Sequence, residues 1–330
     1  MKKIFALLLS AALLVTLLAA CGGGNTTDTD TDTQEPAADA STTQVEEQEP
    51  DTGDASKDDP LNQDEIGEKE LLVVSFGTSY TDSRRETIGA IEKAMQTAFP
   101  DYSVRRAFTS QIIIDHVKDR DGVTIDNVEQ ALERAVNNGV KTLVVQPTHL
   151  MNGLEYEELT DELAKYSDSF EKIAIGDPLL TSDADFEAVM TAITDATKDA
   201  ADGKTAICFM GHGTTADSNS VYSKMQTLLT DKGFNDYYVG TVEATPSLDD
   251  VLAAVQKGNY EKVILRPLMI VAGDHANNDM AGDEDDSWKS TFEKAGYTAD
   301  CQVEGLGQLE AIQQLFVEHA KAAVASAEAE

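Results

Sequence analysis

Short apolar segments alternate with helix-like segments from residue 70 to the end of the chain, and this alternation restricts the fold more than any other feature. Consecutive strands joined by helices form parallel sheets with right-handed crossovers. The predicted strands are Leu71–Phe76, Val104–Phe108, Thr142–Gln146 and Lys172–Ile175 in a first series, and Thr205–Met210, Tyr237–Val242, Lys262–Leu265 and Asp300–Glu304 in a second. We therefore predict an α/β fold with two similar domains, each a parallel sheet flanked by helices.

The two series also match in local sequence, which indicates an internal duplication. The matching segments are SFGTS at Ser75–Ser79 with MGHGTT at Met210–Thr215, and VVQPTHL at Val144–Leu150 with ILRPLMI at Ile264–Ile270. The folded part is also too long for one typical domain. We place the two domains at residues 70–185 and 186–330, and expect them to face each other across an active-site cleft.

The first residues have the composition of an export signal. A positive start, Met1–Lys3, precedes the apolar run Ile4–Leu18, which is short for a membrane span. The Leu-Ala-Ala-Cys that ends at Cys21 resembles the bacterial lipobox, which implies cleavage before Cys21 and lipidation of its thiol. We predict a lipoprotein signal peptide over residues 1–21, with an ordinary signal peptide as the alternative. The protein would then be extracytoplasmic, anchored to the membrane by lipid at the cell surface or the periplasmic face.

Residues 22–69 are predicted to be a disordered acidic linker. Three glycines follow Cys21, and the rest is mainly Thr, Asp, Glu, Gln, Ala, Ser and Pro. Such a segment cannot bury enough apolar surface to offset its conformational entropy. A random coil of about 45 residues has a root-mean-square span of about 40 Å, so the linker would hold the folded part clear of the bilayer.

The charge of the chain excludes one class of partner. It has 25 Lys and Arg against 60 Asp and Glu, a formal net charge of −35. We expect no nucleic-acid partner, because phosphate binding needs a basic face. The three cysteines contain no C-x-x-C pair, which argues against a zinc finger or a thioredoxin-type site.

Three strands of the second series are followed by metal-binding types of residue. His212 follows the first strand, Glu243 the second, and His275 the third, within the acidic stretch Val263–Trp288. Open α/β sheets bind ligands at the carboxyl ends of their strands. Two imidazoles and a carboxylate suit a first-row divalent cation with open coordination positions. The residues alone also allow His275 to be an ordinary loop histidine and Glu243 to be a carboxylate at a helix N-terminus.

Six segments, in order along the chain, resemble the anaerobic sirohydrochlorin cobaltochelatases of the CbiK type. They are SFGTSY at Ser75–Tyr80, RAFTS at Arg106–Ser110, THLMNGLEYE at Thr148–Glu157, FMGHG at Phe209–Gly213, GTVEATP at Gly240–Pro246 and PLMIVAGDHANNDMAGDEDDSWK at Pro267–Lys289. The resemblance covers nearly all of residues 70–330 but not the signal and linker, which cytoplasmic members lack. It implies a class II chelatase, similar in fold to protoporphyrin ferrochelatase.

The resemblance also implies roles for individual residues. By it, His212 is a metal ligand and the catalytic proton acceptor, Glu243 and His275 are the other metal ligands, and Glu155 is a catalytic acidic residue facing the cleft. The implied reaction inserts Co²⁺ into sirohydrochlorin, in anaerobic cobalamin biosynthesis, with release of the two pyrrole protons and without ATP. An imidazole that titrates near neutrality suits the removal of pyrrole N–H protons.

The tetrapyrrole would need an apolar cleft for its ring and hydrogen-bond donors for its carboxylates. Ser75, Thr78 and Ser79 lie at the start of the first predicted helix and are candidate donors. Arg84 and Arg106 are alternatives. Further candidates for lining the cleft, each of which a structural role would also explain, are His149, Phe76, Met151, Met269, Met280 and Trp288.

The metal and the physiological role stay open at this point. Cobalamin precursors are made in the cytoplasm, whereas this chain is predicted to be exported. The competing functions are a cobaltochelatase, a chelatase that inserts Fe²⁺ or Ni²⁺ into a related tetrapyrrole, and a membrane-anchored lipoprotein that binds metal or tetrapyrrole for uptake. Sites of this type follow the general order of divalent affinities, so the ligand set does not choose the metal. Homo-oligomerisation also stays open.

Overall fold

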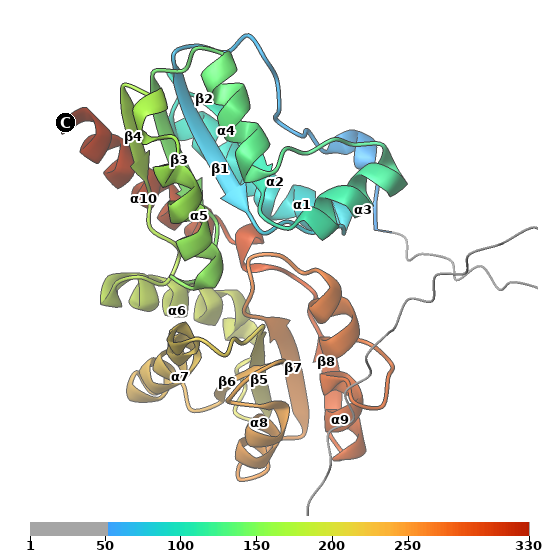
Figure 1. The fold of residues 1–330 in the computed structure, drawn as a ribbon. Coiled ribbons are helices and arrows are strands. Elements are labelled where there is room, and N and C mark those ends of the chain that lie inside the picture. Colours follow the sequence, from blue (N-terminus) through green and yellow to red (C-terminus); the bar gives the residue numbers. More distant parts are fainter. Residues whose placement is uncertain (1–51, 330) are drawn as a thin grey trace, which may run out of the picture. The chain divides into compact units, whose positions relative to one another are not determined.

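The computed structural model describes residues 52–329 of the chain. Two four-stranded parallel sheets form the frame of these residues, one in each half (Figure 1). The strand order is β2-β1-β3-β4 in the first sheet and β6-β5-β7-β8 in the second. The predicted signal peptide, the predicted lipidation site at Cys21 and the first part of the predicted linker lie outside the described residues.

The same order of elements recurs in both halves. The strands are β1 (Lys69–Ser75), β2 (Ser103–Phe108), β3 (Thr142–Pro147), β4 (Lys172–Ile175), β5 (Thr205–Gly211), β6 (Tyr237–Thr241), β7 (Lys262–Pro267) and β8 (Thr298–Cys301). The α-helices are α1 (Thr81–Glu86), α2 (Ile88–Ala98), α3 (Gln111–Asp121), α4 (Val128–Asn137), α5 (Leu154–Ala164), α6 (Asp183–Thr197), α7 (Ser220–Asp231), α8 (Leu248–Val255), α9 (Trp288–Lys294) and α10 (Glu310–Ala329). The predicted α/β fold with two similar parallel sheets is confirmed.

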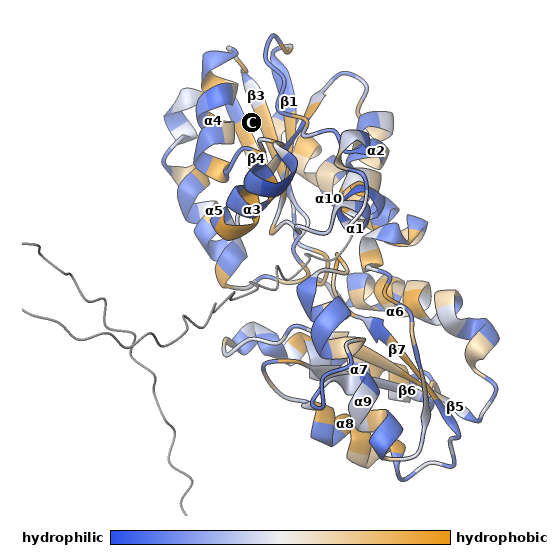
Figure 2. Ribbon diagram, turned by 90° about the vertical axis from the view of Figure 1, so that its right-hand side faces the viewer, coloured by the Kyte–Doolittle hydropathy of each residue, from blue (hydrophilic) through white to orange (hydrophobic). Residues whose placement is uncertain are grey.

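The central strands show why the apolar runs in the sequence are continuous. In β1 every residue after Lys69 is buried, and in β5 every residue is buried. Helices cover both faces of a central parallel strand, so it presents no polar side to water. In Figure 2 the strands carry mostly hydrophobic colours, whereas the helices around them mix hydrophobic and hydrophilic residues.

Local capping signals fix where several helices begin. Asn127 starts α4, Ser182 starts α6 and Ser247 starts α8, each in a capping box with the residue three positions later. In such a box, two side chains satisfy backbone N–H groups that the helix itself leaves without acceptors. The helices therefore begin at defined residues after the strand ends.

The closing helix corrects the predicted assignment of residues 186–330 to the second domain. Helix α10 packs against β3, β4 and α2 of the first half (Figure 1). Lys172 on β4 donates to the carbonyl oxygen of Ala327 at 2.8 Å. The main apolar core contains Val73 and Val144 of the first half together with Phe209 of the second and Phe316 of α10. The chain thus returns to the first sheet, and the two halves share a core.

The segment from residue 52 to 68 corrects the predicted linker, which was expected to continue to residue 69. This segment, which we call the arm, is packed onto the first half. Leu61 is buried in the main core, and its carbonyl oxygen accepts from the Arg106 backbone N–H at 3.1 Å. Thr52 accepts in the same way from the Asp82 backbone N–H at 2.7 Å. The structured part of the chain therefore begins at least as early as residue 52.

Asp58 is the main polar attachment of the arm. Its side chain is only 2% exposed and lies 2.6 Å from Arg84 Nε and 2.8 Å from Arg106 Nη1. Burial opposes the charge of Asp58, but the guanidinium groups of Arg106 and Arg84 outweigh it and hold the pKa of the carboxyl below its usual value. Glu92 balances the remaining charge of Arg106 at 2.7 Å. Asp58 lies in a segment of low-complexity composition, but its carboxylate pairs with two buried arginines.

Asp58→Ala is expected to lower the free energy of unfolding by roughly 3–5 kcal/mol, because buried Arg84 loses its closest carboxylate and buried Arg106 keeps only Glu92. Urea unfolding followed by the fluorescence of Trp288, the single tryptophan, measures this. The matched control is Asp64→Ala on the same arm, whose pair with Arg134 is 62% exposed at the aspartate and should contribute about 1 kcal/mol or less. Equal effects of the two substitutions would show that the arm is not held by Asp58.

Candidate active site

A cleft between the two halves gathers residues from strand ends of both sheets. Its volume is about 670 Å³. The segments that follow β1 and β3 line it from the first half, and the segments that follow β5, β6 and β7 line it from the second. All of these are carboxyl ends of parallel strands, where open α/β sheets bind their ligands. The cleft lies where the sequence predicts an active site.

The three predicted metal ligands come from three neighbouring strands. His212 follows β5, Glu243 follows β6, and His275 follows β7 after a loop. The Glu243 backbone N–H donates to the carbonyl oxygen of His212 at 2.9 Å, which continues the pairing of β5 with β6 beyond the strands. Strand β5 lies between β6 and β7, so the topology of the sheet brings all three side chains to one edge.

Gly213 allows these loops to approach each other closely. Its φ is +90°, and a Cβ at this position would lie 2.9 Å from the backbone nitrogen of Ala244. Both the left-handed backbone and the lack of space require glycine. The Gly after His212 therefore keeps the His212 and Glu243 segments side by side.

One potential ligand atom from each of His212, Glu243 and His275 lies within 4.8 Å of the others. The two imidazole rings are 4.6 Å apart between centroids at an interplanar angle of 86°, and His212 Nδ1 is 3.9 Å from a Glu243 carboxylate oxygen. Within residues 52–329 this is the one group of three or more His, Cys, Asp or Glu side chains that could hold a metal ion. Two imidazoles and one carboxylate can bind a divalent cation and leave positions for other ligands.

Both imidazoles are oriented through Nδ1. His275 Nδ1 lies 2.7 Å from a carboxylate oxygen of Asp279, and His212 Nδ1 lies 2.8 Å from the carbonyl oxygen of Gly213. A proton on each Nδ1 satisfies these acceptors and leaves each Nε2 lone pair for a metal or a proton. Asp279 reaches His275 because residues 276–280 form one turn of π-helix. The i, i+4 spacing of His275 and Asp279 is visible in the sequence and is the signal that could have revealed this pairing.

Glu155, the predicted catalytic carboxylate, lines the cleft at the start of α5. The cleft walls desolvate its carboxyl group and raise its pKa. The imidazole of His212 works in the opposite direction, and the charge of Glu158 adds to the increase. A carboxyl group with a raised pKa close to His212 suits proton transfer between the site and solvent.

The predicted substrate-binding residues Ser75, Thr78, Ser79, His149 and Met269 all line the same cleft. Ser75 Oγ is 2.7 Å from the hydroxyl of Thr148, so these two buried hydroxyls already bond each other. The His149 ring is buried, its nitrogens have no hydrogen-bond partner among the described residues, and burial lowers its pKa to about 4. His149 is therefore a neutral imidazole in the cleft wall at physiological pH.

Four of the secondary candidates for substrate contact lie elsewhere. Arg84 and Arg106, considered for the substrate carboxylates, are buried and paired with Asp58. Met280 and Trp288, considered for the ring, are buried in the core of the second half. The ring candidates Phe76 and Met151 do line the cleft, together with Met269. The prediction that Arg84 or Arg106 binds substrate is wrong, because both pair with Asp58 of the arm, and the sequence around the arginines does not show this pairing.

The two halves touch beside the His275 loop. The Ala272 backbone N–H donates to Ser83 Oγ of α1 at 3.0 Å. A Cβ on Gly273 would lie 3.1 Å from the hydroxyl oxygen of Thr78, so a larger residue would press on that segment. Helix α1 thus supports the loop that carries His275.

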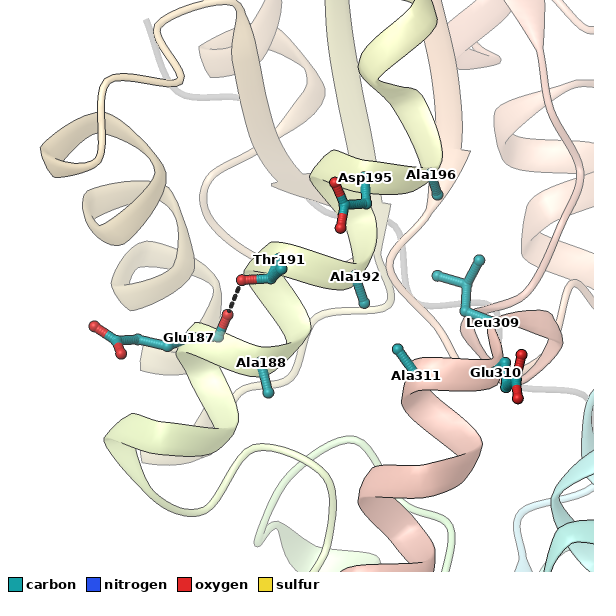
Figure 3. Close-up of a pocket in the computed structure, with 9 residues that line it drawn as sticks. All are labelled: Glu187, Ala188, Thr191, Ala192, Asp195, Ala196, Leu309, Glu310 and Ala311. Carbon is teal, nitrogen blue, oxygen red and sulfur yellow. Dashed lines mark hydrogen bonds between the residues drawn. The ribbon is translucent and has the colours of Figure 1, made fainter.

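A second hollow lies between α6 and the start of α10 (Figure 3). Alanines form much of its wall, and its polar groups are the carboxylates of Glu187, Asp195 and Glu310 and the hydroxyl of Thr191. That hydroxyl donates to the carbonyl oxygen of Glu187 at 2.8 Å. No histidine lines the hollow, and among the described residues its carboxylates form no group close enough to hold a metal ion, so the cleft is the better candidate for the chemistry.

Comparisons with known proteins agree with this site. The cobalt chelatase (CbiK) family model matches residues 69–325. The chain is 38% identical to the sirohydrochlorin cobaltochelatase of Salmonella typhimurium over 251 residues, which are 76% of this chain and 94% of that protein. It is 30% identical to the sirohydrochlorin cobaltochelatase CbiKC of Nitratidesulfovibrio vulgaris over 260 residues, 78% of this chain and 91% of that protein.

A solved structure shows the same fold at low sequence identity. SirB from Bacillus subtilis with Fe³⁺ superposes with a TM-score of 0.57 at 14% identity, covering 80% of this chain and 98% of that one. The arm and the residues before it lie outside the family match, which begins at residue 69.

Proposed function

The chain belongs to the CbiK family of cobalt chelatases, and on that basis we propose that it inserts Co²⁺ into sirohydrochlorin without ATP. The structural observation that supports this proposal most directly is the group His212, Glu243 and His275 at the edge of the cleft, with ligand atoms within 4.8 Å of one another. Three protein ligands hold the substrate ion and leave positions that the ring nitrogens can take.

The residues around the ion also handle the protons that must leave. Two pyrrole N–H protons depart as Co²⁺ enters, so the charge of the ring centre is unchanged. As the ion passes to the ring nitrogens it leaves His212 Nε2, whose lone pair then accepts a proton from the ring, while Nδ1 stays bonded to the carbonyl oxygen of Gly213. Glu155, with its raised pKa, passes protons to the solvent at the mouth of the cleft.

Mixing the purified protein with sirohydrochlorin and Co²⁺ and following the visible spectrum tests the activity. Metal insertion should change the spectrum to that of the cobalt complex, with a rate proportional to enzyme concentration. Parallel reactions with Fe²⁺ and Ni²⁺ rank the metals, because the ligand set alone follows the general order of divalent affinities. A spectral change on binding without insertion of any metal would favour the alternative, a tetrapyrrole- or metal-binding protein that serves uptake.

We further propose that the protein is an exported lipoprotein, attached through lipid on Cys21. The support is the sequence: the positive start, the apolar run and the Leu-Ala-Ala-Cys that ends at Cys21. Among residues 52–329, no helix has the length and apolar character that crossing a bilayer demands.

Cys21→Ser is expected to move the protein from the membrane fraction to the soluble fraction, or to leave the precursor unprocessed, because the proposed attachment is the lipid on this thiol. Fractionation with metabolic labelling by a fatty acid measures both. Cys208→Ser is the control, since this cysteine is buried in the core and should keep the label. Equal membrane attachment and labelling of Cys21→Ser and the parent would exclude the lipid anchor.

A further inference from the structure

The residues that line the cleft carry negative but no permanent positive charge. Four of them are carboxylates: Glu155, Glu158, Glu243 and Asp274. Among the described residues that line the cleft there is no lysine and no arginine. Sirohydrochlorin, the substrate under the proposed function, carries many carboxylates on its rim. Anionic ligands are usually bound by Arg or Lys, which pair with carboxylates directly.

The arginines that lie near the cleft segments in sequence are engaged elsewhere. Arg266, three residues before Met269, is paired with Glu304 at 2.8 Å. Arg84 donates from Nη1 to the carbonyl oxygen of Thr78 at 2.9 Å, and its Nε is paired with Asp58. Arg120 donates to the carbonyl oxygen of Ser79 at 2.6 Å and to both carboxylate oxygens of Asp121 at 2.7 Å. Arg84 and Arg120 therefore bind backbone carbonyl groups of the cleft loop, and their positive charges are paired with Asp58 and Asp121.

The mouth of the cleft is apolar instead. Phe76 is 47% exposed and Leu154 is 57% exposed, although large apolar side chains are usually buried. Both line the cleft, together with Ile113, Met151 and Met269. Exposed apolar side chains around a concave site are typical of ligand binding, and these match the faces of a tetrapyrrole ring.

From these two observations we infer that the cleft holds the tetrapyrrole by its ring faces and leaves the ring carboxylates in solvent. This inference rests on the proposed function for the kind of ligand. Its consequence is that an acid-rich tetrapyrrole approaches against electrostatic repulsion from the cleft, in a chain of formal net charge −35. Specificity for the ring then comes from apolar contact and from the metal, not from recognition of individual carboxylates.

Salt should therefore strengthen binding of the tetrapyrrole, the opposite of the usual effect on a charged ligand. Between about 10 mM and 0.15 M salt the Debye length falls from roughly 30 Å to roughly 8 Å, which screens the repulsion. We expect kcat/KM for sirohydrochlorin at saturating Co²⁺ to rise roughly threefold to tenfold over this range. A decrease with salt would overturn the inference, because it requires cations that pair with the carboxylates. No change would also overturn it, because it would mean that no repulsion from the cleft opposes binding.

Binding without metal separates this inference from the proposed activity. The probes are three porphyrins with the same ring and successively fewer carboxylates: uroporphyrin, coproporphyrin and mesoporphyrin. Their affinities are measured by porphyrin fluorescence across the same salt range. We expect the affinity for uroporphyrin to increase roughly threefold to tenfold with salt, that for mesoporphyrin to change less than about twofold, and coproporphyrin to lie between. If this order holds while no metal is inserted, the proposed activity fails and the binding mode stands.

A single carboxylate at the cleft provides the matched test. Glu158→Gln removes one negative charge from the lining, and should both tighten uroporphyrin binding at low salt and reduce its salt dependence. Glu157→Gln, one residue away on α5 and outside the cleft lining, removes the same charge and should leave the salt dependence near that of the parent. Equal effects of the two substitutions would show that net charge, rather than the cleft, controls approach, and would overturn the local part of the inference.

Discussion

His212→Ala is expected to lower the rate of cobalt insertion by roughly 10²–10⁴-fold, the range typical for loss of a general acid or base. The substitution removes one of three metal ligands and the imidazole whose Nε2 accepts the pyrrole proton. The fold should survive, because the His212 side chain is 50% exposed and contributes little to the core. The insertion rate is measured from the visible spectrum, and the integrity of the fold from urea unfolding.

Two observations make this result specific to the site. Raising Co²⁺ should not restore the rate, because excess metal does not replace a base, whereas imidazole added to the solution should restore part of it. His116→Ala is the control: this histidine is exposed on α3, outside the cleft lining, and its loss should leave the rate within about twofold. A parental rate in His212→Ala would mean that the proton acceptor has been misassigned.

The position of the site is largely readable from the sequence, and the reason is topological. Parallel strands joined by right-handed crossovers end at the same edge of a sheet, so polar residues just after successive strands meet there. His212, Glu243 and His275 follow three such strands. Predicting the strands was sufficient to predict that these side chains meet, without knowledge of any side-chain contact.

The strands were predictable because central parallel strands require continuous apolar runs. Strand β4 has the predicted bounds, Lys172–Ile175, and the other strands differ from prediction by a few residues at their ends. The helices of the first half were less readable. The sequence from Arg85 to Phe99 predicts a single helix, whereas the structure has α1 and α2, which meet at Thr87. There φ is −110° and ψ is −76°, and Gly307 packs closely against Thr87.

Helix α3 was not predicted, although its capping signals are present. Ser110 caps its start, and Gly122 ends it in the left-handed conformation. Its three consecutive isoleucines obscure the helical period, because Ile114 is buried while Ile112 is exposed. An apolar residue that faces outward gives the same local signal as one that faces the core, so periodicity alone does not separate them.

The arm and the closing helix depend on contacts that no local pattern contains. Asp58 lies in an acidic stretch like many disordered segments, and only the distant Arg84 and Arg106 distinguish it. Helix α10 follows the last strand of the second half but covers the first sheet. Composition and periodicity describe neighbours in sequence, whereas these features pair residues that lie from 26 to 155 positions apart in the chain.

His275→Ala is expected to raise the Co²⁺ concentration needed for half-maximal insertion by roughly 100-fold or more, above the range for loss of an outer partner of a ligand, with a smaller effect on the rate at saturating Co²⁺. This substitution removes a ligand but leaves the proposed proton acceptor His212 in place. Its activity should therefore be rescued in part by excess metal, unlike that of His212→Ala. Calorimetric titration with Co²⁺ in the absence of tetrapyrrole measures the affinity directly.

Substitution of Asp279 should weaken Co²⁺ binding less than loss of His275 does, and it tests whether the orientation of His275 matters for metal affinity. Asp279→Asn keeps the size of the side chain but weakens its bond to His275 Nδ1, and loss of such an outer partner typically lowers metal affinity roughly 10-fold to 100-fold. Asp283→Asn removes an equal charge from the same acidic stretch, where the exposed carboxylate pairs with Lys289, and should leave the affinity near that of the parent. If Co²⁺ binds most weakly to His275→Ala, more tightly to Asp279→Asn and most tightly to Asp283→Asn, the ion lies at the imidazole of His275. If all three bind Co²⁺ like the parent, the ion lies elsewhere, and the juxtaposition of the two imidazoles would then need a structural explanation.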